Sequence, residues 1–171
     1  MQLGSFGKDI IGIDSKDAAS LLLIINGVGV SGRVIPTLLA PKYGPMNLII
    51  PLSFASGLIL LCWAAVNNHS GLLVFDVFYG FMMASAQGMF PPSLGSLTTD
   101  LSKMGVRMGM VFSLMGFALL IGNPLAGALI SLEGGKYLYA QMYAGSALVA
   151  GVVLLVAARI ARTGWKICVR I

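Results

Sequence analysis

The sequence predicts an all-α membrane protein: a polytopic bundle of five transmembrane helices. Hydrophobic residues make up 57% of the chain and charged residues 10%, whereas soluble domains average about 45–50% apolar and about 25% charged residues. Four uncharged stretches are each long enough to cross a bilayer, which takes about 20 apolar residues. These stretches are residues 43–68, 77–99, 108–132 and 137–158. They lack the period-two alternation of a membrane β-barrel, so helices are predicted.

The first span is predicted over residues 20–40, after a polar segment, residues 1–19, that we expect to form an extracellular loop or tail. Pro36 is expected to kink the span or loosen its last turns. Arg33 is unusual, because a charge at the centre of a membrane helix costs about 2.5–3.5 kcal/mol on insertion scales. Two interpretations stay open for Arg33: its side chain snorkels to the interface, or it faces a polar partner or a solute path.

The second span is predicted over residues 47–66 and the third over residues 72–94. Within the third span, Gly80, Ala84 and Gly88 are spaced by four residues. Small residues at this spacing let two helix backbones approach closely, so we expect a tightly packed helix pair on this face.

Two polar side chains of the third span are candidate functional residues. Asp76 lies about one turn inside the start of the span, where it is either an interface residue or a carboxylate that lines a solute path. Gln87 lies deeper and either makes an interhelical hydrogen bond or contacts a solute.

The fourth span is predicted over residues 108–132, in which the pair Asn123-Pro124 favours a kink or hinge. The fifth span is predicted over residues 137–158, and residues 159–171 form a basic tail. The five predicted spans and their short connections leave no room for a soluble domain.

The positive charges fix the expected orientation, because Lys and Arg accumulate on the cytoplasmic side of membrane proteins. One side holds Lys42, Lys103, Arg107, Arg159, Arg162, Lys166 and Arg170. The other side holds Lys8, Lys16 and Lys136. The carboxy terminus is therefore expected in the cytoplasm and the amino terminus outside, with further membrane segments upstream. The expected location is a multi-pass position in the plasma membrane.

No catalytic or metal-binding arrangement can be assembled from the sequence. His69 is the single histidine, and the two cysteines, Cys62 and Cys168, have no metal-ligand spacing. We therefore predict that the chain is not an enzyme and needs no cofactor or metal. The net charge of +5 follows the ends of the spans, so the expected partner is a lipid bilayer and not a nucleic acid.

Three stretches resemble motifs of the major facilitator superfamily, and more closely those of fungal members of the monocarboxylate porter family. Residues 32–47 resemble the family's helix eight and the loop that follows it. Residues 105–109 are similar to the loop before helix eleven, and residues 122–127 to the glycine-proline motif within that helix. The segment GSFGKDIIGID near the amino terminus resembles the loop between helices seven and eight. The resemblance covers the chain as helices eight to twelve of a twelve-helix transporter.

The resemblance implies alternating access around a central site, with Arg33 as the intramembrane arginine that attracts an organic anion of the monocarboxylate type. The remaining implied residues are a polar lining and a gating loop. The lining residues are Asn26, Gln87, Asn123 and Asp76, and the gating-loop residues are Lys42, Gly44 and Arg107. The implied partners are a small-molecule solute and a missing amino-terminal half. The alternative is a truncated membrane fragment that does not transport and only packs with a partner half or another membrane protein.

Two positions depart from the family pattern. Pro41 stands where the family's loop usually has an acidic residue, which weakens the expected gating network. Gly29 stands one turn before Arg33, where better-known members of the family have an aspartate. The resemblance therefore implies no proton-coupling pair at these two positions.

Overall fold

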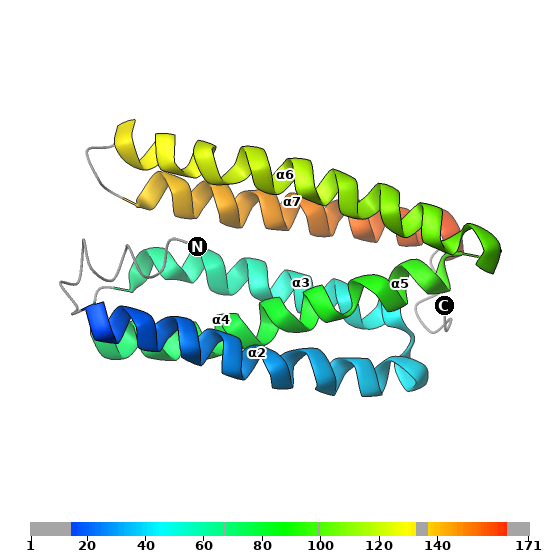
Figure 1. The fold of residues 1–171 in the computed structure, drawn as a ribbon, viewed down its shortest axis with the longest axis horizontal. Coiled ribbons are helices and arrows are strands. Elements are labelled where there is room, and N and C mark those ends of the chain that lie inside the picture. Colours follow the sequence, from blue (N-terminus) through cyan, green and yellow to red (C-terminus); the bar gives the residue numbers. More distant parts are fainter. Residues whose placement is uncertain (1–14, 67, 99, 133–136, 164–171) are drawn as a thin grey trace.

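The computed structural model describes residues 15–66, 68–98, 100–132 and 137–163. In these residues every regular element is a helix, as the sequence predicts (Figure 1). The long helices are α2 (Ser15–Tyr43), α3 (Pro45–Cys62), α4 (His69–Gly88), α6 (Met104–Leu132) and α7 (Leu138–Thr163), and the shorter elements are α5 (Phe90–Ser96) and the 3₁₀ turns Trp63–Ala65 and Leu101–Lys103.

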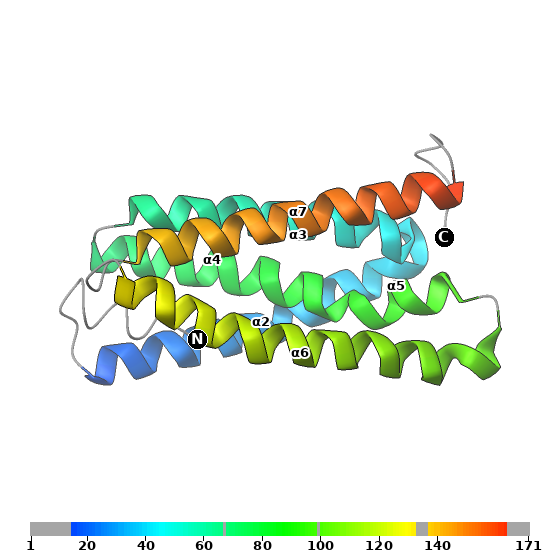
Figure 2. The ribbon, with the colours of Figure 1, turned by 90° about the horizontal axis from the view of Figure 1, so that it is seen from above.

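Five helical segments of the described residues have the length and hydropathy needed to cross a membrane, which confirms the predicted number of spans. They are Ala19–Tyr43, Pro45–Cys62, His69–Ser96, Met104–Leu132 and Leu138–Ala161. The third segment contains both α4 and α5. The long helices lie roughly along one common axis, so the molecule is an elongated bundle (Figures 1 and 2).

Helix α2 begins before the predicted first span and stays helical to its end. It starts at Ser15, where Asp17 in the first turn interacts favourably with the helix dipole. It also continues through Pro36, where we expected a kink or loosened turns. Proline cannot donate a hydrogen bond to the carbonyl four residues earlier, which is that of Gly32. The hydroxyl of Ser85, on α4, lies 2.8 Å from this carbonyl and 2.6 Å from the Phe81 carbonyl of its own helix, so its single proton is shared between the two acceptors.

The third span is broken where the sequence placed its double proline. Helix α4 ends at Gly88, and α5 starts at Phe90 with the prolines in its first turn. A first turn tolerates proline because its N–H groups have no partner within the helix. The chain is held across the break by the Met89 N–H, which donates to the Ser85 carbonyl at 3.1 Å.

Helices α2 and α4 are parallel and closely packed, as the small-residue pattern predicted. A Cβ atom added to Gly80 would lie 2.8 Å from the Ile25 side chain, and one added to Gly88 would lie 3.2 Å from the Arg33 Cα atom. Ala84 occupies the matching place opposite Gly29. Gly80, Ala84 and Gly88 thus meet successive turns of α2 between Ile25 and Arg33.

The remaining helices are arranged around this pair. Helix α3 packs against α4 and α7, whereas α6 contacts mainly α7 and α5 (Figure 1). No described residue of α6 is buried, in contrast to α3 and α4. One hydrophobic cluster joins the starts of α2, α4 and α7 to the end of α3, and a second joins the end of α2 to the start of α3. Leu60, Trp63 and Phe75 of the first cluster also line part of the candidate site.

Candidate functional site

A polar hollow of about 130 Å³ lies between α2 and α4, and we call it the arginine hollow. It brings together three of the residues predicted from the sequence: Asn26 and Arg33 from α2, and Gln87 from α4. The three meet because α2 and α4 are parallel and in close register. The rest of its lining is Ile25, Gly29, Tyr79, Gly80, Met83 and Ala84.

The arginine hollow leaves hydrogen-bonding groups available to a ligand. Within the described residues no ion pair involves Arg33, whose side chain is exposed along the hollow. Asn26 donates its amide nitrogen to the Leu22 carbonyl at 2.6 Å, which leaves its amide oxygen as an acceptor. A guanidinium beside two amides can bind a carboxylate through paired hydrogen bonds.

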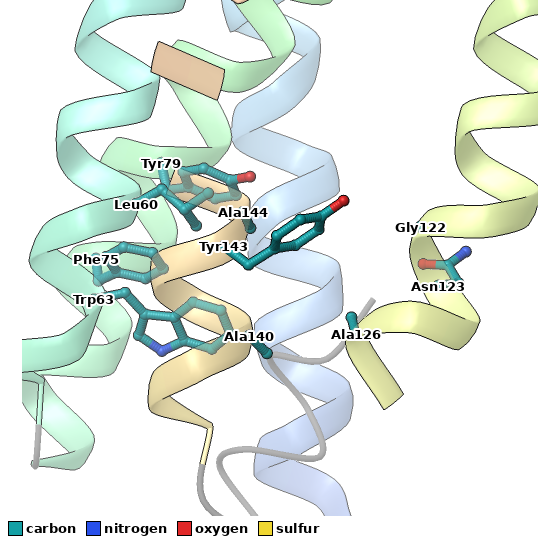
Figure 3. A pocket seen from close by; sticks show the side chains of 10 residues that line it. All are labelled: Leu60, Trp63, Phe75, Tyr79, Gly122, Asn123, Ala126, Ala140, Tyr143 and Ala144. Carbon is teal, nitrogen blue, oxygen red and sulfur yellow. The ribbon is translucent and has the colours of Figure 1, made fainter. Parts of the chain in front are cut away.

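A second hollow of about 310 Å³ lies between α3, α4, α6 and α7, and we call it the aromatic hollow (Figure 3). Its lining is Leu60, Trp63, Phe75, Tyr79, Gly122, Asn123, Ala126, Ala140, Tyr143 and Ala144. Asn123 is therefore separated from the arginine hollow, although the sequence grouped it with Arg33. Tyr79 lines both hollows, so the two are neighbours along α4.

Asp76 lines neither hollow. Its side chain is 1% exposed, and neither carboxylate oxygen accepts a hydrogen bond. It follows Phe75 on α4, at the level where Leu21 and Leu72 are buried in the first hydrophobic cluster. Asp76 is thus a buried carboxylate next to apolar side chains.

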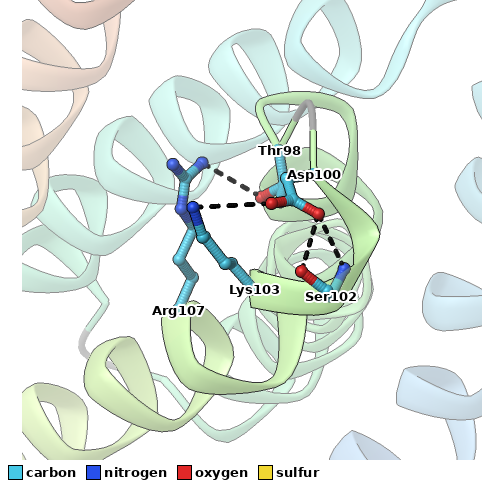
Figure 4. Close-up of polar contacts among 5 residues, drawn as sticks. All are labelled: Thr98, Asp100, Ser102, Lys103 and Arg107. Atoms are coloured by element: carbon cyan, nitrogen blue, oxygen red, sulfur yellow. Dashed lines mark hydrogen bonds and ion pairs between the residues drawn. The ribbon is translucent and has the colours of Figure 1, made fainter.

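The predicted gating residues lie at the end of the bundle where α2, α5 and α7 end. Gly44 joins α2 to α3 with φ of 86°, a conformation that favours glycine. The Lys42 ammonium lies 5.5 Å from the centre of the Tyr43 ring. Arg107, near the start of α6, donates to the Thr98 hydroxyl at 3.5 Å (Figure 4).

A small charged cluster surrounds Asp100 at the same end (Figure 4). Asp100 accepts hydrogen bonds from the Ser102 hydroxyl at 2.7 Å and from the Ser102 N–H at 3.1 Å. The Lys103 ammonium forms an ion pair with it at 3.5 Å. The hydrogen bonds from Ser102 lower the pKa of Asp100 from its ordinary value of 3.8, and Lys103 and Arg107 act in the same direction. Asp100 therefore stays ionised at neutral pH.

Several site residues were not predicted as such from the sequence. Trp63 and Tyr143 were not singled out from the sequence, yet both line the aromatic hollow. Phe75 and Tyr79 are four residues apart on α4, so their shared face was visible in the sequence, but their stacking partner Trp63, in the 3₁₀ turn after α3, was not. Ser85 was also missed, because a serine in an apolar helix carries no signal until the carbonyl that it meets is known.

A larger hollow of about 710 Å³ lies between α3, α5, α6 and α7. Among its lining residues, only Ser53 has a polar side chain, and most of the others have apolar side chains, such as Phe90, Met115 and Leu155. This lining suits hydrocarbon and not a solute with functional groups. In the part of the chain that the structure describes, no group of three His, Cys, Asp or Glu side chains could hold a metal ion.

Comparison with known proteins adds an independent observation. No protein-family model matches the chain. An MFS-type transporter of Gibberella zeae is 39% identical over 159 residues, which are 92% of this chain and 36% of that protein. The chain is a homologue of major facilitator superfamily (MFS) transporters. The MFS-type transporter dbaD of Emericella nidulans is 36% identical over 146 residues, 84% of this chain and 33% of that protein. The aspyridones efflux protein apdF of the same fungus is 30% identical over 148 residues, 86% of this chain and 30% of that protein.

This MFS homologue spans about a third of the length of the curated relatives that it matches. The similarity and the five apolar helices identify it as an integral multi-pass membrane protein. None of these three relatives is named a monocarboxylate porter.

Proposed function

We propose that the chain forms the carboxy-terminal part of a transporter that moves a small organic anion of the monocarboxylate type across the plasma membrane by alternating access. The observation that supports this function is the arginine hollow. A guanidinium and two amides face one hollow in the middle of membrane-spanning helices. A charge in this position is energetically costly. Charged residues that are kept within membrane spans commonly pair with other polar groups or mark the path of a solute or ion.

The direction of transport that we propose is export. It is supported by one relative of this chain, which is named an aspyridones efflux protein. In the complete transporter the solute would bind between two halves that rock around it. Arg33, Asn26 and Gln87 would hold its anionic end, while Lys42, Gly44 and Arg107 would take part in closing the cytoplasmic side. We place the basic tail in the cytoplasm.

The test is export of radiolabelled benzoate and propionate from cells that express the complete transporter to which this chain contributes its carboxy-terminal part. Arg33→Ala should lower export of both acids at least about tenfold, since a lost charge-assisted pair is worth about 1.5–3 kcal/mol. Arg33→Lys should keep part of the activity, because it retains the charge but not the planar fork. Lys16→Ala is the matched control, because it removes an exposed charge from the start of the same helix.

Equal amounts of each variant must be found in the membrane fraction for the comparison to hold. Unchanged export by Arg33→Ala would contradict the role of the arginine. The absence of export of either acid by the complete transporter would contradict an anionic solute of this class.

A second candidate function is that of a packing fragment that does not transport. The observation that favours it is α6, whose described residues are all at least partly exposed. This helix therefore has surface available for a partner half. Co-expression with the amino-terminal half of the Gibberella zeae relative tests this alternative. Stable co-purification without export supports the packing fragment, whereas export restored by the pair supports the transporter.

A further inference from the structure

We propose that the aromatic hollow is a binding site for a flat aromatic ring, so that the solute is an aromatic carboxylate. Its ring would lie in the aromatic hollow and its acid group at Arg33. This inference rests on the proposed function for the acid group, while the ring site stands on its own geometry.

The wall of the aromatic hollow is a row of stacked rings from two helices. The Trp63 and Phe75 ring centres are 5.7 Å apart with 22° between the planes. The Phe75 and Tyr79 ring centres are 5.3 Å apart with 9° between the planes. Tyr143, from α7, lies in front of this row and faces α6 (Figure 3). Flat rings that are already parallel to one another offer a surface on which another ring can stack.

The size of the hollow fits this ligand. Its volume is about 310 Å³, and an apolar cavity of about 150 Å³ holds a benzene molecule in another protein. The aromatic hollow therefore has room for one or two fused rings with a substituent. Asn123 faces it from α6 and supplies the amide that could bind a hydroxyl or carbonyl substituent on the ring (Figure 3).

Tyr79 connects the ring site to the anion site. It stacks on Phe75 at one side and lines the arginine hollow at the other. Gln87 lies two turns further along the same helix, beside Arg33. The two hollows are thus ordered along α4, with the apolar one toward its start and the charged one toward its end. An elongated molecule with a ring at one end and a carboxylate at the other matches this order.

The experiment uses the full chain in nanodiscs, with Trp63 as the reporter. Trp165, which lies outside the described residues, is replaced by phenylalanine so that Trp63 is the single tryptophan. The probes are 4-bromobenzoate and 4-bromobenzyl alcohol, whose bromine quenches tryptophan emission on contact. Both should quench Trp63 saturably, and the acid should bind more tightly.

Two variants separate the two parts of the site. Tyr143→Ala should raise the half-saturating concentration of both probes about three- to tenfold, the usual range for one aromatic contact. Arg33→Gln should weaken the binding of 4-bromobenzoate and leave that of the alcohol unchanged. Tyr139→Ala is the control for Tyr143, because it removes an exposed tyrosine one turn earlier on α7 that does not line the hollow.

The outcomes distinguish failure of this inference from failure of the proposed function. Absence of saturable quenching, or quenching that Tyr143→Ala leaves unchanged, overturns the ring site even where Arg33→Ala abolishes export. Equal affinity of acid and alcohol, unaffected by Arg33→Gln, contradicts the anion site and the aromatic carboxylate while it supports the ring site.

Discussion

A hydroxyl from α4 compensates in part for the hydrogen bond that α2 loses at Pro36. The proline cannot donate to the Gly32 carbonyl, and the Ser85 hydroxyl lies 2.8 Å from this carbonyl while it also bonds to the Phe81 carbonyl at 2.6 Å. In a membrane, a backbone carbonyl without a partner costs free energy that no water can recover. Ser85 is 0% exposed, so this bond is shielded from solvent and lipid.

We expect Ser85→Ala to lower the free energy of unfolding by about 1 kcal/mol, since the Gly32 carbonyl loses its substitute donor. Pro36→Ala restores the N–H group that normally serves this carbonyl. In that background the cost of Ser85→Ala should become much smaller. The measurement is a double-mutant cycle by denaturation in mixed micelles. Ser31→Ala is the control, because the Ser31 hydroxyl bonds only within α2. An equal cost in both backgrounds would mean that Ser85 does not compensate for the proline.

Asp76 is expected to reduce stability. An ionised carboxylate without partners costs several kcal/mol when it is buried, and neither oxygen of Asp76 accepts a hydrogen bond. Asp76→Asn should therefore raise the midpoint of thermal unfolding. Asp100→Asn gives the contrasting case, because it removes bonds to Ser102 and Lys103 and should not raise the midpoint. If Asp76→Asn is stable but no longer exports solute, the carboxylate is kept for function. A lowered midpoint would show that the native carboxylate stabilises the fold.

At the scale of elements, the contact of α2 with α4 depends on Gly32. A Cβ atom at this position would lie 2.6 Å from the Phe81 carbonyl oxygen and 3.3 Å from the Ala84 side chain. Because the first obstacle is backbone, the two helices would have to separate. Gly32→Ala should lower the free energy of unfolding by about 1–3 kcal/mol. It should also weaken anion binding, since the same helix pair forms the arginine hollow.

Gly27→Ala is the matched control on the same helix, because a Cβ atom there would meet nothing within 4 Å. This variant should be as stable as the parent protein or slightly more stable, since alanine favours helix more than glycine does. Both variants can be followed by thermal unfolding of the purified protein. Equal stability of the two variants would contradict the close packing of α2 and α4.

The five spans and the α2–α4 face could be predicted because both depend on local patterns. Uncharged length identifies a span, and Gly80, Ala84 and Gly88 repeat at the period of one helix face. The behaviour at Pro36 could not be predicted, because the group that completes its hydrogen bonding comes from another helix. The early start of α2 at Ser15 was missed for a different reason: polar residues in a first turn look like a loop in the sequence.

The candidate site was predicted only where its residues share the α2–α4 pair. Arg33, Asn26 and Gln87 were grouped from the sequence and do line one hollow. Asn123 was grouped with them, but α6 is placed by contacts with α7 and α5, which no local pattern encodes. The aromatic hollow was missed for the same reason, since its rings come from three helices far apart in the chain.

At the scale of the whole molecule, the positive charges of the described residues separate the two ends of the bundle. Lys42, Lys103, Arg107 and Arg159 all lie toward the end where α2 and α7 finish. At the opposite end, where α2 begins, the described residues include one lysine, Lys16. This asymmetry supports the orientation with the basic end in the cytoplasm, which labelling from one side of the membrane can test.

The test uses single cysteines in a background in which Cys62 and Cys168 are serine. Asn68→Cys places a thiol at the exposed turn before α4, and Ser102→Cys places one at the exposed link before α6. A membrane-impermeant maleimide added to intact cells should label Asn68→Cys and should label Ser102→Cys only after permeabilisation, because the single span between them, His69–Ser96, puts the two positions on opposite sides. Export activity of each variant controls for correct folding. Labelling of Ser102→Cys in intact cells would reverse the orientation, and the charges near Asp100 would then face the outside, where they could not serve a cytoplasmic gate.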